Sequence, residues 1–505
     1  MRRMNGLDRM FLFVESEKIP MDLIGIFLLD PSTAPDGVHD FQRVRAELAA
    51  RITRVPLFTS RPVFAPFAAG HESWLTVGDF DIDHHLKHVG VPAPRDFGAL
   101  CELVSTLVNK PLDRDRPLWH AYYVDGFADG SAALLLRLHH ASIDGVGGMQ
   151  MMTELFDTEP LPASAIPAPT PVPGERVPLP GELLARSMPD QVVNGIRFLR
   201  HAIPLAVPVF RGLASRLLSG EQSTTEPPSE AGPDDGATPR SLFNRPTETG
   251  KRAVSATSVS MTDVRTITER FGVTVNDVVL SVTNAAVVDY LRARDELPDE
   301  PLRVTGPVNI REESATAADG NHFTFMLTAI PDIADPVERL RTVAARTAKA
   351  RPERTARAGD PTVRKPTNAV LENVMGLVDS LPGATWFALR DLVTSPVFNA
   401  VPPVVNYIVS NIPGPKGKLY LAGAEITHIH GRTMVGGGVG LFVFCVSHAD
   451  TLDFGITTLA ELVPDPAEIA DGIGHHFEVL LAEARKRKQA ATDRAGRAGK
   501  GRSGR

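Results

Sequence analysis

A histidine pair closes an apolar run and is followed by an aspartate and glycines in LLLRLHHASIDGVGGMQMM, residues 134–152. A neutral imidazole, with an ordinary pKa of about 6.5, can take a proton from a hydroxyl group and hand it on. The glycines that begin at Gly145 permit close approach of backbone and substrate. The pattern predicts general acid–base chemistry by one of the two histidines, with Asp144 nearby.

Alternation along the expected strand, SAALLLRLHH, separates the two imidazoles. His140 shares one face with Leu138, and His139 shares the other with Arg137, unless the strand ends between the histidines. We therefore expect one histidine to be chemical and the other structural. Adjacent histidines on opposite faces chelate a metal poorly, and no further His, Asp or Glu cluster completes the set, so we expect no metal. Without a GxSxG motif, a covalent intermediate is not indicated.

Two other histidine pairs have different surroundings. His475-His476 lies in a helical pattern and is expected on a partly exposed helix face. His84-His85 lies among acids and is expected at the surface or at a strand end. Only the pair at 139–140 ends a run that is typical of a buried strand.

Composition sets broad limits on the class of protein. The chain has 505 residues and a net charge of −7, which argues against a general nucleic-acid binder. Its two cysteines, Cys101 and Cys445, lie in apolar stretches without CxxC spacing and are expected to be buried thiols. The N-terminus lacks a signal-peptide pattern, and no run of about 18 uncharged apolar residues occurs. We expect an intracellular protein.

The chain is expected to divide into four parts. Residues 1–158 alternate strand and helix patterns, and residues 250–488 form a second folded region. Residues 159–249 between them comprise a proline-rich linker, amphipathic helices and a disordered acidic linker. Residues 489–505 are expected to be a disordered basic tail.

Two segments are candidates for contact with lipid. Residues 191–220 carry apolar residues at helical spacing together with arginines, which fits a helix pair packed on the protein or an interfacial helix among anionic headgroups. The basic tail fits a solvated tail or one attracted to anionic lipid. The sequence leaves both alternatives open.

Several motifs together resemble one family. HHASIDG matches the HHxxxDG signature of the CoA-dependent acyltransferase superfamily, which includes chloramphenicol acetyltransferase and peptide-synthetase condensation domains. Further blocks resemble the bacterial wax ester synthase/diacylglycerol acyltransferases: LDRMFLFVES (7–16), DFDIDHHLKHVGVP (79–92), PLDRDRPLWH (111–120), VNDVVL (275–280), GPVNIR (306–311), GNHF (320–323), SNIPGP (410–415) and LDFGI (452–456).

The resemblance implies an α/β fold and a set of site residues. Two chloramphenicol-acetyltransferase-like domains are expected, each a mixed sheet with flanking helices, with an active-site tunnel between them. His140 would be the general base. His139, Asp144 and Gly145 would support its loop, with Asp144 turned away to pair with an arginine that the sequence does not identify. Asn276 either belongs to a helix start or lines the tunnel as an oxyanion contact.

The resemblance also implies a reaction. Long-chain acyl-CoA and diacylglycerol would be substrates, triacylglycerol the product, and no cofactor would be needed. The alternatives are a wax ester synthase that uses fatty alcohols, a condensation-type enzyme that acylates an amine, and a non-catalytic lipid carrier. The cytoplasmic protein would associate peripherally with the inner face of the membrane or with lipid droplets.

Overall fold

The computed structural model describes most of the chain: residues 1–66, 72–78, 80–107, 110–143, 145–162, 166, 170–185, 193–194, 196–198, 200, 238–309, 323–350, 380–381, 383–393, 395 and 402–500. Its elements, in chain order, are β1 (Arg2–Arg3), α1 (Gly6–Val14), β2 (Asp22–Asp30), η1 (Pro31–Thr33), α2 (Phe41–Arg51), η2 (Ile52–Arg54), α3 (Pro56–Thr59), β3 (Ser60–Val63), β4 (Ser73–Thr76), α4 (Ile82–His85), β5 (Leu86–Gly90), α5 (Phe97–Leu107), β6 (Trp119–Asp125), β7 (Ala132–His139), η4 (His140–Ser142), α6 (Gly145–Leu155), η6 (Leu242–Asn244), β8 (Arg252–Ser260), α8 (Met261–Phe271), α9 (Val275–Arg292), β9 (Leu302–Asn309), β10 (Phe323–Ile330), α10 (Pro336–Ala350), α12 (Gly383–Val393), β11 (Tyr407–Pro413), β12 (Leu419–Leu421), β13 (Ala424–Arg432), β14 (Leu441–His448), β15 (Thr451–Leu459) and α13 (Ala467–Lys500).

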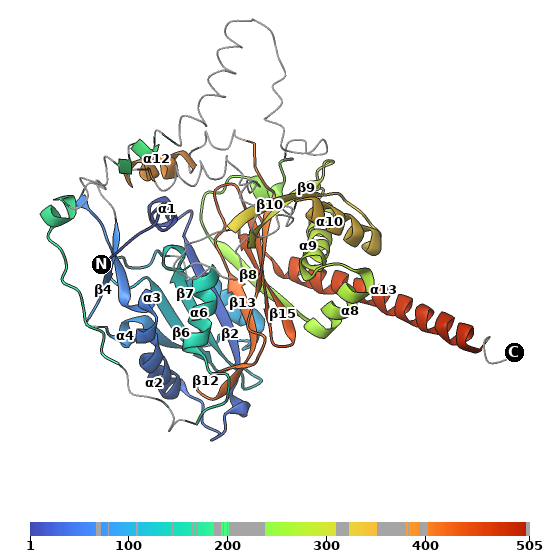
Figure 1. The fold of residues 1–505 in the computed structure, drawn as a ribbon, viewed down its shortest axis with the longest axis horizontal. Coiled ribbons are helices and arrows are strands. Elements are labelled where there is room, and N and C mark those ends of the chain that lie inside the picture. Colours follow the sequence, from blue (N-terminus) through green and yellow to red (C-terminus); the bar gives the residue numbers. More distant parts are fainter. Residues whose placement is uncertain are drawn as a thin grey trace, which may run out of the picture.

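Two mixed sheets, each six-stranded within the described residues, form the centre of the molecule (Figure 1). The first has the order β12-β13-β2-β7-β6-β5 and contains one parallel pair, β5 with β6. The second has the order β10-β9-β11-β14-β15-β8, in which β11 runs parallel to both of its neighbours. The predicted α/β class with two mixed sheets and flanking helices is confirmed.

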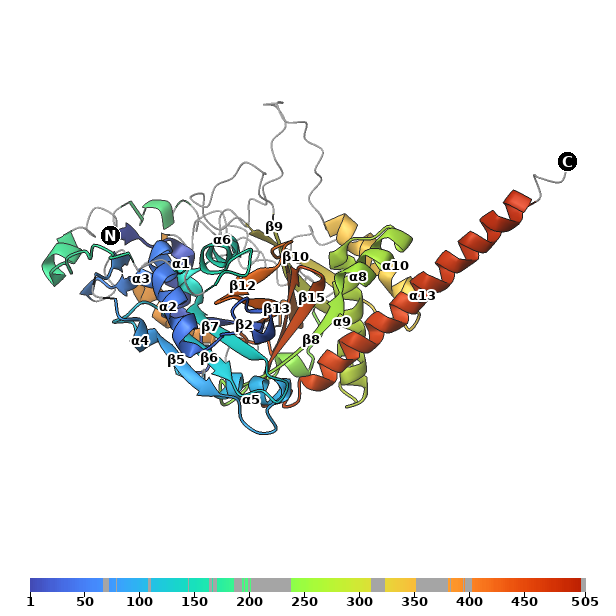
Figure 2. The ribbon, with the colours of Figure 1, turned by 90° about the horizontal axis from the view of Figure 1, so that it is seen from below.

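Helices cover the sheets and close a hydrophobic core on each. Helices α8, α9, α10 and α13 lie together on one side of the second sheet (Figure 2). The largest core joins α9 and α13 to strands β14 and β15. The first sheet has α2 and α6 packed on one face and α5 on the other. Burial of these apolar faces is the main term that stabilises the fold.

The first sheet is completed by strands from the far end of the chain. β13 pairs antiparallel with β2, from Glu425 opposite Asp30 to Arg432 opposite Ile24. β12 continues the sheet beyond β13. The prediction that residues 250–488 form one contiguous C-terminal domain is corrected for these two strands. A pairing between segments so far apart in the chain leaves no local pattern in the sequence, because each strand shows only its own alternation.

β13 also lies across the second sheet, and two glycines permit that crossing. A Cβ atom on Gly455 of β15 would collide with the carbonyl oxygen of Gly431, and a Cβ on Gly431 would collide with the ring of Phe444. Only glycine allows such close approach of two backbones. The LDFGI block therefore has a structural role at the junction of the two sheets.

The connecting segments are described only in part. Residues 170–179 form neither helix nor strand, and Leu183 packs on Val63 and Leu75. Most of the amphipathic segment 191–220 and the acidic linker up to residue 237 lie outside the described residues.

The structure differs from the prediction for the C-terminal tail. The sequence predicted disorder from residue 489, whereas α13 continues to Lys500 and extends away from the body (Figure 1). Alanine, arginine, lysine and glutamine dominate residues 484–490 and have high helix propensity, so the helix that starts on the core propagates outwards.

Helices α8 and α9 meet at a sharp turn with well-defined caps. α8 ends at Gly272, whose φ of 68° is left-handed, and such a glycine is a common helix end. α9 begins with a capping box between Thr274 and Asp277. Within the described ranges, no single helix is long and apolar enough to cross a bilayer, and α8 and α9 pass that test only together, across a bend of 102°.

The core of the second sheet gives a prediction for stability. Leu480 of α13 is 1% exposed within it. We expect Leu480→Ala to lower the free energy of unfolding by about 2–5 kcal/mol, because it removes buried methyl groups and leaves a cavity. Urea unfolding followed by circular dichroism measures this difference.

The matched control for this prediction is Leu179→Ala, because the Leu179 side chain is 63% exposed. Substitution at such a surface position should change the free energy of unfolding by less than about 0.5 kcal/mol. Equal effects in the two variants would contradict the packing described.

Candidate active site

The strand that carries the histidine pair ends between its two members. β7 stops at His139, and the 3-10 turn η4 begins at His140. The backbone N–H of His140 donates to the carbonyl of Met21 at 2.7 Å, which holds the turn against the residue before β2. The change from strand to turn releases His140 from the strict alternation, so the two imidazoles have different surroundings.

His139 is buried and locked in one tautomer. Its Nδ1 accepts the N–H of Ala141 at 3.0 Å, so the ring proton must lie on Nε2. That Nε2 faces Oε1 of Glu15 at 3.3 Å, with both side chains at most 2% exposed. The expectation that one member of the pair is structural fits His139, because both ring nitrogens are committed to the turn and to Glu15.

Glu15 connects the turn to α1, and the sequence analysis assigned it no role. Its Oε2 accepts from Arg114 at 2.9 Å, and Arg114 also donates to the carbonyl of Leu12 at 2.6 Å. Burial raises the pKa of Glu15, but the contacts with His139 and Arg114 outweigh burial and leave the pKa below its ordinary value. Glu15 is therefore a carboxylate at neutral pH. An acid directly after the apolar run Met10–Val14 was the available sequence signal.

His140 is half-buried and lies against an aromatic ring. Its imidazole centroid is 4.1 Å from that of Phe11, with the planes inclined by 32°. Phe11 is on the buried face of α1, the helix that also packs against η4. Stacking orients an imidazole without using its nitrogens as donors or acceptors. The ring contact and the backbone bond to Met21 therefore both contribute to the position of His140.

A buried charge cluster lies beside the end of β7. Asp22, opposite His139 in the β2–β7 pairing, accepts from Arg137 Nε at 2.6 Å and lies 3.2 Å from Arg432 Nη1. Arg252 lies close enough to act on the same carboxyl group electrostatically. Burial raises the pKa of Asp22, and the arginines more than offset it, so the pKa is lowered. Burial and the neighbouring Arg432 lower the pKa of Arg252 to about 9.

The remaining predicted site residues are Asp144, Gly145 and Asn276. Asp144 lies outside the described residues, so its arginine partner is not identified. Gly145 opens α6. Asn276 is half-buried near the start of α9, where Thr274 and Asp277 form the cap without it. A capping role for Asn276 is therefore not needed, and its oxyanion role stays a prediction.

The other histidine pairs occupy the expected kinds of place. His475 is exposed and His476 is half-buried against Asp289 at 2.7 Å. His84 is exposed and bonded to Asp81. His85 lies at a strand end, directly before β5, and is buried: its Nδ1 donates to the carbonyl of Trp119 at 2.8 Å, and its ring stacks on that indole.

The tunnel expected between the domains stays a prediction. A cavity of about 460 Å³ lies in the N-terminal half, lined by residues that include Phe80, His85 and Arg116, and His140 is not part of its lining.

Comparison with known proteins gives matches along nearly the whole chain. The sequence profile of the wax ester synthase/diacylglycerol acyltransferase catalytic domain matches residues 4–279, and the profile of the WS/DGAT C-terminal domain matches residues 319–481. A Mycobacterium tuberculosis protein named as a diacylglycerol O-acyltransferase is 31% identical over 484 residues, covering 95% of this chain and 90% of that protein. Another protein of that name from Mycobacterium tuberculosis is 30% identical, covering 90% and 94%.

Solved structures show the same fold. A wax ester synthase/diacylglycerol acyltransferase from Marinobacter aquaeolei superposes with a TM-score of 0.64 at 22% identity, covering 95% of this chain and 99% of that one. The first condensation domain of the CDA synthetase superposes with a TM-score of 0.51 at 13% identity, covering 95% and 96%. These likenesses confirm the fold that the HHxxxDG resemblance implied.

The contact between Glu15 and His139 generates a prediction about pH. We expect Glu15→Gln to lower the free energy of unfolding at pH 7 by about 1–3 kcal/mol, because a buried hydrogen-bonded charge is lost. The pKa of Glu15 is lowered on folding, so its contribution is present above the ordinary value of 4.5 and is lost as the pH falls through the folded value. The difference between wild type and variant should therefore shrink in acid.

Urea unfolding at a series of pH values from neutral down into acid is the measurement, and Glu17→Gln is the matched control, since Glu17 is exposed in the same segment. A difference that stays constant with pH, or an equal effect of the control, would mean that the carboxylate of Glu15 does not support the turn.

Proposed function

Because the chain belongs to the wax ester synthase/diacylglycerol acyltransferase family, we propose that it transfers a long-chain acyl group from coenzyme A to the free hydroxyl of diacylglycerol, giving triacylglycerol. The relatives named as diacylglycerol O-acyltransferases, which span most of the chain, support this acceptor. The observation that carries the proposal is the placement of His140, in the catalytic-domain segment, at the end of β7 against Phe11.

In the proposed mechanism, His140 is the general base. The imidazole removes the proton of the acceptor hydroxyl as its oxygen attacks the thioester carbonyl, so a carbon–oxygen bond forms and an oxyanion develops. Collapse of this intermediate breaks the carbon–sulfur bond. The protonated His140 then returns its proton to the coenzyme A thiolate. The products are triacylglycerol and coenzyme A, and no covalent acyl-enzyme is needed.

The neighbouring residues have positioning roles in this proposal. His139 and Glu15 hold the turn from which His140 projects, and Asp144 and Gly145 shape the loop behind it. Asn276 is proposed as an oxyanion contact. Acid–base catalysis of this kind contributes about 10²–10⁴ in rate, and alignment of the two substrates in a tunnel between the sheets would supply much of the remainder. The reaction uses no cofactor, since acyl-CoA is a substrate.

The assay separates this proposal from its rivals. We expect purified protein with labelled palmitoyl-CoA and diacylglycerol to form labelled triacylglycerol, and His140→Ala to reduce the rate at least about 100-fold, because the base is removed. Thin-layer separation of the lipids measures the products, and His84→Ala, at an exposed histidine, is the matched control.

Three other outcomes would replace the proposal. Wax ester formed from hexadecanol, with no triacylglycerol, would assign the protein to fatty alcohols. An acylated amine as the only product would indicate condensation chemistry. Binding of acyl chains without turnover in the wild type would indicate a lipid carrier.

The same proposal includes peripheral contact with an anionic lipid surface. Its acceptor and product are insoluble in water, and α13 extends away from the body. The basic tail, residues 489–505, carries five lysines or arginines and one aspartate. Each basic residue near an anionic surface contributes about 1 kcal/mol of attraction. The basic tail is thus the proposed lipid contact; segment 191–220 stays a second candidate.

Removal of residues 489–505 tests this contact. We expect the truncated protein to bind vesicles of phosphatidylglycerol and phosphatidylcholine at least tenfold more weakly, because five basic residues are lost. Co-sedimentation at low and high salt measures the binding, since added salt screens charge attraction. Vesicles of phosphatidylcholine alone are the control. Equal binding by the full and the truncated chains would remove the tail from the proposal.

A further inference from the structure

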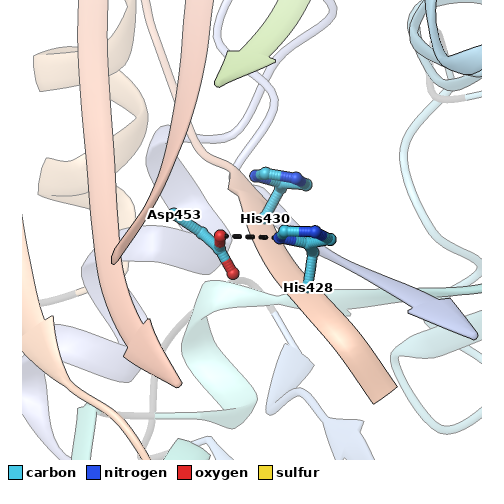
Figure 3. Close-up of side chains that lie close together, drawn as sticks. All are labelled: His428, His430 and Asp453. Carbon is cyan, nitrogen blue, oxygen red and sulfur yellow. Dashed lines mark hydrogen bonds and ion pairs between the residues drawn. The ribbon is translucent and has the colours of Figure 1, made fainter. Parts of the chain in front are cut away.

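Two histidines and an aspartate meet where β13 crosses β15, on elements separate from the His140 turn. His428 and His430 come from β13, and Asp453 comes from β15 (Figure 3). Each offers one ligand atom, and these atoms all lie within 4.8 Å of one another. Nδ1 of His428 is 3.0 Å from Oδ1 of Asp453. No metal was expected from the sequence.

Strand geometry explains why the three groups converge. His428 and His430 are two residues apart, so they project from the same side of β13. The close crossing at Gly431 and Gly455 brings Asp453 of the LDFGI block to that side. Oδ2 of Asp453 accepts the N–H of Ile429 at 2.7 Å and the hydroxyl of Thr451 at 3.2 Å. The carboxylate is therefore fixed, and its Oδ1 is directed at His428.

His430 has a ring nitrogen that lacks a partner in the described part of the chain. The side chain is 3% exposed, and its Nδ1 makes no hydrogen bond there. A neutral imidazole has a lone pair for a ligand, and an unpartnered buried nitrogen costs free energy until it is satisfied.

We propose that His428, His430 and Asp453 form a binding site for a divalent transition metal ion, with Zn²⁺ the best fit. Two imidazole nitrogens and one carboxylate oxygen are a donor set that zinc uses in proteins. His428 is 34% exposed, which gives the ion a route in and leaves room for water as a fourth ligand. The bound ion would join β13 of one sheet to β15 of the other.

Occupation of the site requires one ring to turn. The imidazoles of His428 and His430 are nearly parallel, inclined by 8° with centroids 5.8 Å apart, whereas an ion lies close to the plane of each ring that binds it. His428 has space to rotate at the surface, and the torsion of a histidine ring is soft. On rotation it would exchange its hydrogen bond to Asp453 for a shared ion.

A nucleophilic triad is the rival interpretation of the same residues. Ser258 Oγ lies 3.3 Å from His428 Nδ1, which is the nitrogen that also faces Asp453. A triad histidine uses one nitrogen for the nucleophile and the other for the acid. Both contacts here fall on one nitrogen, so the arrangement favours a ligand set over a proton relay.

Metal binding by the full-length protein tests the proposal. Protein stripped with a chelator and dialysed against Zn²⁺ would be assayed for metal by mass spectrometry, and Co²⁺ would replace Zn²⁺ for absorption spectroscopy. We expect wild type to hold one equivalent more Zn²⁺ than His428→Gln, with at least tenfold higher affinity, and to show visible bands of four-coordinate Co²⁺ that the variant lacks.

His475→Gln, at an exposed histidine of α13, is the matched control and should retain the wild-type site. His428→Gln keeps the bonds of Asp453 to Ile429 and Thr451, and circular dichroism will verify its fold. Asp453→Asn gives a second removal of a ligand. Equal metal content and affinity in wild type and His428→Gln, or an equal loss in His475→Gln, would overturn the proposal, independently of any acyltransferase activity.

Discussion

The pairing of β13 with β2 is the contact on which the rest of the structure depends. It inserts a strand from the last fifth of the chain into the sheet that carries the histidine pair. It places Arg432 beside Asp22, and Asp22 lies opposite His139. The same strand crosses β15, so it links the two sheets directly. In the proposed mechanism, alignment of two substrates at His140 depends on that arrangement, because the proposed tunnel lies between the sheets.

Around His140, the structure combines a firmly held neighbour, His139, with a ring contact on His140 itself. Fixed polar contacts surround His139. Glu15 and the backbone N–H of Ala141 contact its ring, and Arg114 holds Glu15 in place. His140 stacks on Phe11. A base that accepts and returns a proton changes charge twice in each cycle. In the proposed mechanism, the contact with Phe11 orients the imidazole.

The elements and the histidine pair could be predicted from the sequence because their signals are local. Strand alternation, the glycines after Asp144 and the capping box at Thr274 each lie within a few residues. Contacts between distant segments could not be found in this way. Glu15 meets His139 from another part of the N-terminal half, and β13 meets β2 across almost the whole chain. His428 and His430 offered a local signal, their spacing on one strand, but Asp453 belongs to another strand.

The late position of β13 has a consequence for synthesis on the ribosome. β2 and β7 are complete once residue 139 has emerged, but β13, the other neighbour of β2, begins only at Ala424. At a translation rate of about 5–20 residues per second, this edge of β2 waits unpaired for ~15–60 s. An open apolar edge is a template for wrong pairing with other chains. Wrong pairing at this edge is therefore a hazard until the last fifth of the chain has been made.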